Sequence, residues 1–271
     1  MPELPEVETT RQGIAPFVTG KQVTGVIVRR HQLRWPIPAD LELRLSGQTI
    51  ESVRRRGKYL LLGTRAGTLL LHLGMSGSLR ILTRTQPPEP HDHLDLIFGD
   101  GSRLRLRDPR RFGAVVWAGT EPESHKLLRD LGPEPLGGDF GGEYLYHRSR
   151  SRRIAVKQFI MNSAIVVGVG NIYACESLHL AAIHPARPAG NISLERYRKL
   201  ARAIRQTLQQ AIACGGTTLR DFRDSGGHPG YFQQQLNVYG RHGTPCPICR
   251  TPIRRIRQGQ RSTFYCGRCQ R

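Results

Sequence analysis

The order of apolar and polar residues changes along the chain, from short β-like runs in the first half to helical periodicity in the second. The clearest hairpin spans 93–98 and 103–107 around a Gly-Asp-Gly turn. Leu104 and Leu106 alternate there with arginines, which predicts one packed face and one basic face. Other runs bounded by Gly, Pro or charged residues predict strands over 22–29, 49–54, 59–63, 68–73 and 78–82.

Helical patterns accompany these strands. A helix over about 7–18 is expected to bury Val7, Ile14 and Phe17 and to end at Gly20. A second, short helix begins near Glu123. The first half of the chain therefore predicts an antiparallel β-sandwich with one or two helices.

The second half reads as helices around a tight glycine turn. Helical patterns cover about 154–166 and 171–182 and flank the sequence Val-Gly-Val-Gly. A longer helix over 194–213 has Ser193 as its N-cap and glycines after its end. The polar, Gly-rich stretch that follows, 215–230, fits either a functional lid or a disordered connector.

Gly and Pro break the periodicity between about 132 and 146, which predicts a linker there. We expect four segments: a catalytic β-sandwich domain (1–132), a linker (133–150), a helical domain with the Gly-rich loop (151–236) and a zinc finger (237–271).

The charge of the chain favours a polyanionic partner. Lys and Arg number 41 against 21 Asp and Glu, for a formal charge of +20, and most of the cations are arginine. Nucleic acid is favoured over membrane because no apolar run is long enough to span a bilayer. The acidic, proline-punctuated start does not resemble a signal peptide, so we expect a cytosolic protein without disulfides.

Four of the six cysteines predict a metal site. Cys246 and Cys249 form one pair, Cys266 and Cys269 form another, and 16 residues separate the pairs. Two such pairs supply four thiolates to one tetrahedral zinc ion, which has no open position and is therefore structural. A basic hairpin over 251–265 is expected between them, while Cys175 and Cys214 are expected to be buried small residues.

The first residues combine an amine with carboxylates. Removal of Met1 is expected before a residue as small as Pro2, and it would leave a secondary amine that is partly neutral at physiological pH. Such an amine can form a Schiff base with a sugar while Glu3 moves the protons. Pro5 and Glu6 also fit an ordinary helix start.

Several turns fit contact with nucleic acid, although each also fits a structural role. The turn at 168–170 can leave N–H groups free for a phosphate, or Asn171 can simply cap the helix. Met75 and Phe112 at loop tips, beside Arg110, suit insertion into a kinked duplex or a small hydrophobic cluster. Lys58 can face a phosphate or belong to a solvated basic run, and so can the cations from Arg148 to Lys157.

Four features occur in one order: the start Pro-Glu-Leu-Pro-Glu-Val-Glu, the turn at 108–113, the turn at 168–173 and the cysteine pairs. In this the chain resembles, over its whole length, the formamidopyrimidine-DNA glycosylases of bacterial base-excision repair. The resemblance implies an α+β fold, in which an N-terminal antiparallel β-sandwich with helices precedes a helix-two-turn-helix domain that ends in a β-hairpin zinc finger. It also implies a monomeric glycosylase and AP lyase that acts on oxidised purines and abasic sites in double-stranded DNA.

The resemblance also implies residue roles. Pro2 would attack C1′ of the damaged nucleotide, Glu3 would shuttle protons, and Lys58 and Arg261 would serve the β- and δ-elimination steps. Residues implied at the lesion or the gap it leaves are Glu6, Met75, Arg110, Phe112, Thr217 and Tyr231. Residues implied to contact the DNA are His91, Arg110, Arg152, Lys157, Asn171 and Arg261.

Two alternatives stay open at this point. Endonuclease VIII shares the terminal amine and the finger but removes oxidised pyrimidines, and its relatives usually lack the turn at 108–113. A non-catalytic zinc-finger DNA-binding protein would explain the charge and the finger, but not Pro2, Glu3 and Lys58 together. One departure from the family pattern is Asn162-Ser163-Ala164, which puts local helix packing in doubt.

Overall fold

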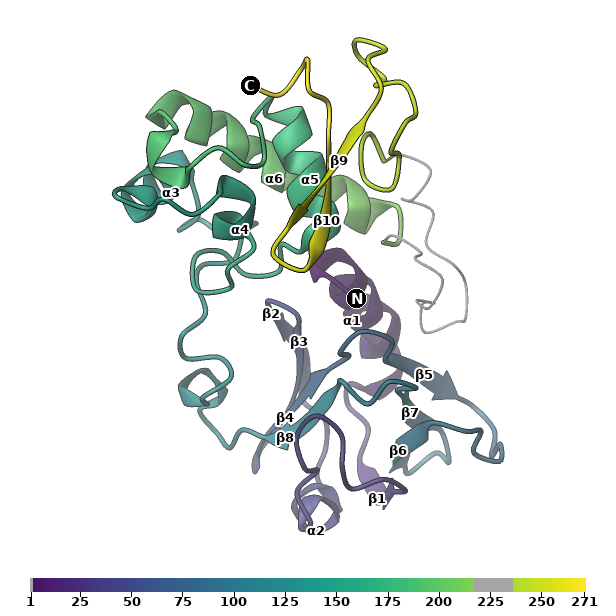
Figure 1. The fold of residues 1–271 in the computed structure, drawn as a ribbon. Helices are drawn as coiled ribbons and strands as arrows, with labels where there is room; N and C mark the ends of the chain where they lie inside the picture. The colour runs from purple at the N-terminus through teal and green to yellow at the C-terminus, as the bar shows by residue number, and fades with distance from the viewer. Residues whose placement is uncertain (1, 217–235) are drawn as a thin grey trace. The chain divides into compact units, whose positions relative to one another are not determined.

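The computed structural model describes residues 2–216 and 236–271, and it divides into two compact units (Figure 1). Unit 1 comprises Met1–Arg129 and Cys214–Tyr231, and unit 2 comprises Asp130–Ala213 and Phe232–Arg271. Thr217 and Tyr231, which were expected at the lesion, lie outside the described residues.

Unit 1 contains two four-stranded antiparallel sheets. The first has the order β1 (Val23–Val28), β6 (Asp92–Phe98), β7 (Arg103–Arg107) and β5 (Ser78–Leu82). The second has the order β2 (Ser52–Arg56), β3 (Tyr59–Thr64), β4 (Gly67–His72) and β8 (Ala114–Trp117). Seven of these strands were predicted. Strand β8 was not predicted, because it is only four residues long, directly follows the Arg-rich turn and shows no alternation of apolar and polar residues.

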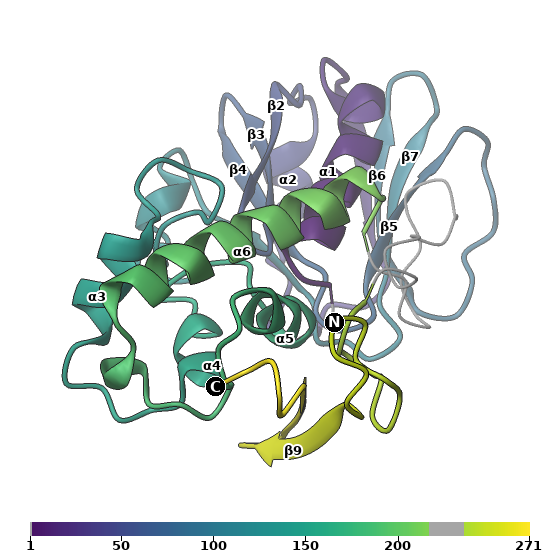
Figure 2. The same cartoon turned by 90° about the horizontal axis from the view of Figure 1, so that it is seen from above.

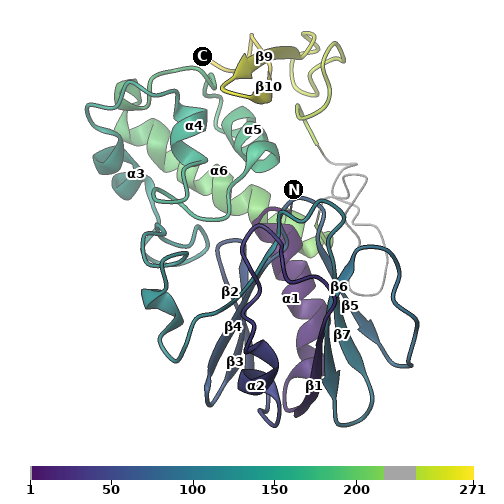
Figure 3. The ribbon, with the colours of Figure 1, turned by 60° about the horizontal axis from the view of Figure 1, so that its bottom comes forward.

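One apolar core joins both sheets to the helix α1 (Leu4–Val18). Figure 3 shows α1 between the sheets, and its buried residues include Val7, Ile14 and Val18. The prediction that Phe17 is buried is wrong, since its side chain is 48 % exposed. Phe17 lies about 100° round the helix from Val18, outside the buried stripe. A short helix α2 (Leu41–Leu45) buries its two terminal leucines in the same core.

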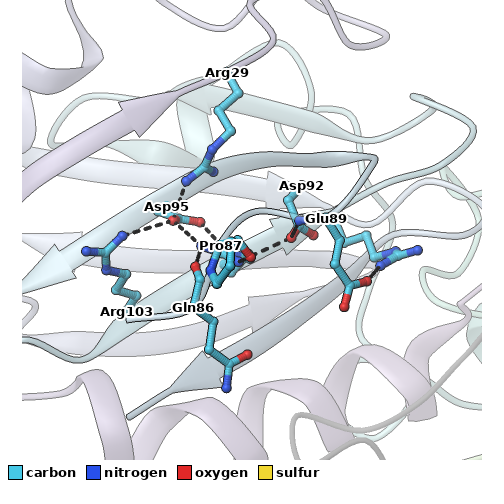
Figure 4. A network of polar contacts seen from close by, with 9 residues as sticks. Arg29, Gln86, Pro87, Glu89, Asp92, Asp95 and Arg103 are labelled. Carbon is cyan, nitrogen blue, oxygen red and sulfur yellow. Dashed lines mark hydrogen bonds and ion pairs between the residues drawn. The ribbon is translucent and has the colours of Figure 1, made fainter. Parts of the chain in front are cut away.

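The hairpin of β6 and β7 contains a buried ion-pair network (Figure 4). The alternation of leucine and arginine in the sequence did not predict this network. Arg105 is 3 % exposed and donates to both carboxylate oxygens of Asp95, at 2.8 Å each. Arg29 adds a contact of 2.6 Å to Asp95. Burial raises the pKa of Asp95, but the hydrogen bonds from Arg105 and Arg29 outweigh it, and the pKa falls below its usual value. The face of this hairpin that was expected to be basic and exposed is therefore partly buried, and Arg105 on it is paired with aspartates.

The same network anchors the loop before β6. Arg105 also donates to the carbonyl oxygens of Gln86 and Pro87, both at 3.1 Å, and it reaches Asp92 at 3.3 Å. Asp92 in turn accepts the N–H of Glu89 at 2.8 Å. Backbone polar groups of this loop are thus satisfied by side chains.

Unit 2 is built on the long helix α6 (Leu194–Ala213), against which α3 (Gly142–Ser149) and α5 (Asn171–Leu180) pack (Figure 2). Helix α4 (Val156–Ile160) is shorter than the predicted 154–166, because a turn in which the Asn162 side chain accepts the Ala164 N–H replaces its continuation. Helix α3 was not predicted. Single 3₁₀ turns occupy η1 (Pro122–Ser124) in unit 1, where a short helix was expected, and η2 (Ala189–Asn191) in unit 2.

The C-terminal hairpin pairs β9 (Arg254–Gln258) with β10 (Arg261–Tyr265), as predicted, and it lies against α5. Behind it, Cys175, Val238, Cys246, Ile253 and Cys266 form a small buried cluster. No helix in the described ranges is both long and apolar enough to cross a membrane.

The carboxylate of Glu176 on α5 fixes the segment that enters the finger. It is 3 % exposed and accepts the backbone N–H groups of Asn237, Val238 and Tyr239 at 2.8 to 2.9 Å. Three such donors satisfy a buried carboxylate without a cation. The finger is therefore attached to α5 by both apolar and polar contacts.

Candidate active site and metal centre

Two buried carboxylates meet at the start of α1. Glu3 is the N-cap residue, its N–H donates to the Glu6 carboxylate at 2.8 Å, and its own carboxylate accepts the N–H of Glu6 in return. Pro2, Glu3 and Glu6 are all buried. The capping box explains why acids suit these positions structurally, and it also holds both carboxyl groups next to Pro2.

Gly216 brings the far end of unit 1 back to this helix start. A Cβ at Gly216 would lie 3.4 Å from side-chain atoms of Glu6. Gly216 has φ +83°, which favours glycine over other residues. Gly216, the last residue described before position 236, therefore lies beside Glu6, the residue expected at the damaged base.

Lys58 follows Gly57 in the turn between β2 and β3. The preceding strand is held to α1, since Arg55 contacts the Glu8 carboxylate at 3.0 Å. The next residue, Tyr59, pairs with His72 of β4, and their ring centroids are 4.8 Å apart. Burial, together with the nearby charges of Lys58 and Arg34, lowers the pKa of His72 to about 4. The His72 imidazole, across the strand pair from the residue after Lys58, is therefore neutral at neutral pH.

Two turns of unit 1 lie against each other: the Met75 turn (residues 74–77) and the Arg110 turn (residues 108–113). A Cβ at Gly74 would lie 2.4 Å from the backbone carbon of Phe112, so the two backbones are in direct contact. Phe112 is 44 % exposed, and the Arg110 guanidinium lies 5.1 Å from its ring centroid. The two turns are separated by 30 residues in the sequence, but they are in contact in the folded structure.

Of the residues expected at phosphates, His91 lies close to the Arg110 turn. Its carbonyl oxygen accepts the Asp108 N–H at 3.0 Å, and its side chain is exposed. His91 has φ 76°, an unusual backbone conformation for a residue other than glycine. Arg152 in unit 2 is also exposed, and its Nε donates to the carbonyl oxygen of Arg148 at 3.0 Å.

In unit 2, Asn171 at the start of α5 contacts the finger hairpin. Its amide nitrogen donates to the carbonyl oxygen of Ser262 at 3.1 Å. Its amide oxygen accepts from the ammonium of Lys157 at 2.5 Å, and Lys157 also donates to Thr263 at 2.7 Å. Lys157 is only 1 % exposed. The ammonium thus orients the Asn171 amide and fixes it to β10.

Arg261, the first residue of β10, is exposed and pairs with Gln258 across the hairpin. Together with Lys157 and Asn162 it lines a hollow of about 240 Å³ between the hairpin and α4. The finger therefore presents a basic side chain next to the Asn171 amide.

The four cysteines of the two pairs converge in the finger. Their sulfur atoms all lie within 4.8 Å of one another. Two Sγ separations are 3.4 Å (Cys249 to Cys266) and 3.9 Å (Cys246 to Cys269). Tetrahedral zinc with Zn–S bonds of about 2.3 Å requires sulfur atoms about 3.8 Å apart. The donor set fits zinc, and four thiolates leave no position for substrate.

Comparison with known proteins agrees with this geometry. Residues 1–115 match the model of the formamidopyrimidine-DNA glycosylase N-terminal domain, and 131–223 match the H2TH domain of the same enzyme. Residues 243–271 match the zinc finger found in FPG and IleRS. The chain is 61 % identical to the formamidopyrimidine-DNA glycosylase of Alkalilimnicola ehrlichii and 59 % identical to that of Stutzerimonas stutzeri, with both chains covered completely in each case.

The chain belongs to the formamidopyrimidine-DNA glycosylase family. Family members are DNA glycosylases of base-excision repair with AP lyase activity. The α+β fold, the zinc finger and the enzyme class expected from sequence are thereby confirmed.

Solved structures of the family superpose closely on this one. A complex of a mutant Lactococcus lactis enzyme with Fapy-dG DNA has a TM-score of 0.93 at 32 % identity and 99 % coverage of both chains. The Thermus thermophilus protein has a TM-score of 0.88 at 38 % identity, with 99 % of this chain and 98 % of that chain covered. Another Lactococcus lactis complex, with oxidised-pyrimidine DNA, has a TM-score of 0.91 at 32 % identity and 99 % coverage of both.

Sequence reasoning missed two residues that the fold brings to the site, His72 and Asp108. His72 ends a strand and looks like an ordinary polar terminus, so only its register opposite Tyr59 reveals its place near Lys58. Asp108 was noted only as the first residue of its turn, although it is completely buried. The sequence signal that could have indicated a role for Asp108 is a carboxylate within a short turn that is rich in arginine.

Proposed function

We propose that the chain excises oxidised purines from double-stranded DNA through a Schiff base on Pro2. The free Pro2 nitrogen attacks C1′, the glycosidic bond breaks, and the base leaves with its electron pair and takes up the proton that the Pro2 nitrogen loses. Glu3 protonates the sugar ring oxygen, so the ring opens and an iminium ion forms between the Pro2 nitrogen and C1′. The burial of Glu3 at 3 % and its hydrogen bonding to the helix start support this role.

The strand is then cut on both sides of the sugar. Loss of a C2′ proton expels the 3′ phosphate by β-elimination, and a second proton loss expels the 5′ phosphate by δ-elimination. We assign Lys58 to the first step and Arg261 to the second. The neutral His72 ring near Lys58 supports the assignment, because it adds no further positive charge to that turn.

The lesion itself is assigned to a separate set of side chains. A base must leave the stack before its glycosidic bond can be reached. Met75, Arg110 and Phe112, on adjoining turns, suit the gap that results, and Arg110 suits the orphan cytosine. Glu6 is assigned to the extruded base, together with Thr217 and Tyr231.

Basic and polar side chains of both units are assigned to phosphates. His91 and Arg110 serve in unit 1, and Asn171, Arg152 and Arg261 serve in unit 2. Lys157 is assigned to this group through Asn171, because its buried ammonium holds the Asn171 amide. We place the enzyme on chromosomal DNA in the bacterial cytosol, which the charge of +20 supports.

The zinc ion has no step in this reaction. When bound to the four thiolates it supplies folding energy to the finger, and the finger presents Arg261. Zinc therefore supports catalysis only through the position of the hairpin.

The observation that carries the proposal is the start of α1. There, Pro2 stands next to two buried carboxyl groups that hydrogen-bond within one capping box. A DNA-binding module without chemistry requires neither a terminal proline nor two buried acids.

Borohydride trapping tests the proposal. Reduction of the iminium links the protein irreversibly to a duplex that contains 8-oxoguanine opposite cytosine, and the adduct is seen on a denaturing gel. Pro2→Gly is expected to lower the yield at least tenfold, because a primary amine replaces the secondary one. Pro5→Ala is the matched control, since Pro5 lies in the same helix start but carries no free amine.

Other outcomes identify the alternatives. An adduct with thymine glycol and none with 8-oxoguanine would assign the chain to oxidised pyrimidines, a substrate class that the oxidised-pyrimidine complex makes worth including. Tight, salt-dependent binding without any adduct would leave a DNA-binding protein and refute the chemistry.

A further inference from the structure

We infer that Asp108 and Ser76 are positioning residues that hold the Met75 turn and the Arg110 turn together as one rigid unit. The inference rests on the proposed function only for what the two turns do at DNA. Their coupling is a property of unit 1 itself.

Asp108 links the two turns through its carboxylate. Its Oδ1 accepts the Ser76 hydroxyl at 3.2 Å, and its Oδ2 accepts the Gly113 N–H at 2.7 Å. Ser76 then accepts the Arg110 N–H at 3.3 Å. Ser76 thus joins the Met75 turn to Asp108 and Arg110, while the Asp108 carboxylate also ties together the two ends of the Arg110 turn.

The carboxylate is buried and has no cationic partner among the described residues. Asp108 is 0 % exposed and Ser76 is 8 % exposed. A buried carboxylate depends on each hydrogen-bond donor that faces it, because water cannot replace a lost one. The site therefore tolerates little movement of either turn.

The backbone of Asp108 is held as firmly as its side chain. Its N–H donates to the carbonyl oxygen of His91 at 3.0 Å, and its own carbonyl oxygen lies 2.9 Å from Nε2 of His93 and accepts the Arg111 N–H at 3.1 Å. The same residue thus joins His91, which is assigned to a phosphate, to the two turns.

Close packing of two glycines completes the unit. A Cβ at Gly74 would lie 2.5 Å from the Gly113 nitrogen, and a Cβ at Gly113 would lie 2.8 Å from the His72 carbonyl oxygen. The turns therefore touch backbone to backbone, and neither can shift without breaking the Asp108 contacts. Met75, Arg110 and Phe112 consequently keep fixed relative positions before DNA arrives, which lowers the ordering cost of filling the gap.

Ser76→Ala tests the coupling without touching a residue assigned to DNA. The first measurement is hydrogen exchange of the free protein, followed by mass spectrometry of peptides that cover residues 72–79 and 107–114. Loss of the hydroxyl should raise exchange at least fivefold in both peptides. Ser102→Ala is the matched control: Ser102 is also buried in unit 1, but its hydroxyl bonds to Asp100 and Lys21.

The second measurement compares two substrates. In Ser76→Ala, kcat/KM on an 8-oxoguanine duplex should fall at least tenfold, because the gap is filled less well. The rate of adduct formation on a single-stranded abasic oligonucleotide, which offers no gap, should stay within twofold of wild type. Asp108→Asn should give an intermediate loss on the duplex, since its amide oxygen still accepts the Gly113 N–H.

Two results would overturn the inference. One is faster exchange confined to 72–79, which would show that the turns move independently. The other is an equal loss on both substrates, which would indicate a general structural effect. A wild-type protein that forms no adduct at all would refute the proposed chemistry, while hydrogen exchange would still decide the coupling.

Discussion

The β-sandwich of unit 1 and the zinc finger of unit 2 are stabilised in different ways. In the β-sandwich, leucines and valines of both sheets and of α1 form one continuous apolar core. The finger has a far smaller cluster, in which two of the five fully buried members are themselves metal-binding cysteines. Apolar burial stabilises a domain roughly in proportion to the area removed from water, so the finger needs the metal and the sandwich does not.

The two regions also treat buried charge differently. The sandwich pairs Arg105 with Asp95 and Asp92, a network of opposite charges. The finger instead receives its support from α5, where Glu176 accepts backbone N–H groups and His179 lies 3.6 Å from the sulfur of Cys246. The sandwich is thus self-contained, whereas the finger depends on metal and on its neighbouring helix.

Removal of one zinc ligand should give the largest effect. Structural zinc contributes on the order of 10 kcal/mol to the folding of small domains. Cys249→Ser is therefore expected to lose zinc, unfold the finger and weaken DNA binding at least a hundredfold, while the sandwich stays folded. Metal analysis and binding titrations measure this, and Cys214→Ser is the control. A variant that retained one zinc per chain would refute the four-cysteine site.

Breaking the buried network should be the next largest effect. Arg105→Ala leaves Asp95 and Asp92 in the interior with one cation fewer, which typically costs about 3 to 5 kcal/mol. Urea unfolding should show the loss in the sandwich while the zinc content stays unchanged. Arg54→Ala removes an exposed pair with Glu123 and should change stability by less than about 0.5 kcal/mol. Equal losses in the two variants would contradict the importance of burial.

His72 should make the stability of the sandwich depend on pH. Its pKa is about 4 in the folded protein, below the ordinary 6.5, so between these values the unfolded state binds more protons. The contribution is therefore present above pH 6.5 and is lost as the pH falls toward 4, and it amounts to about 3 kcal/mol. Nδ1 of His72 accepts the Gly74 N–H at 3.0 Å. His72→Asn keeps an acceptor for this N–H and should flatten that slope in urea unfolding. A slope identical to that of wild type would exclude His72 as its source.

Removal of the contact between His179 and Cys246 should give the smallest effect. This contact belongs to the zinc finger and not to the β-sandwich. In the tautomer that carries the proton on Nε2, His179 donates to the Cys246 sulfur and stabilises its negative charge, as outer-shell partners of metal ligands do. His179→Phe should accelerate zinc release to a chelator about tenfold, near the lower end of the range for such partners. His179→Gln can still donate and should fall between wild type and His179→Phe. Unchanged release in both variants would show that the contact is packing alone.

Sequence predicted most of the elements, because apolar periodicity reports which face of each element is buried. Helix α6 matches the predicted 194–213, β5 and β7 match their predicted bounds, and the finger hairpin ends where predicted but begins three residues later, at Arg254. Helix α3 and strand β8 were missed because they are short and their burial comes from α6 and from β4, which lie far away in sequence. The proposed limits of the linker and of the helical domain remain predictions.

What the sequence by itself determined is chemistry that depends on residue type and local spacing. The four-cysteine pattern, the acids after Pro2 and the excess of arginine needed no fold to be recognised, since each is a matter of residue type, count or spacing along the chain.

Only the tertiary structure decided which distant residues share a site. Asp108 faces Ser76, His72 lies near Lys58, and Arg105 turns inward to Asp95. These contacts depend on strand register and on how the two sheets pack. A shift of one residue in the pairing of a strand would move each of its side chains to the opposite face of the sheet. A carboxylate or a guanidinium looks the same in sequence whether water or another side chain satisfies it.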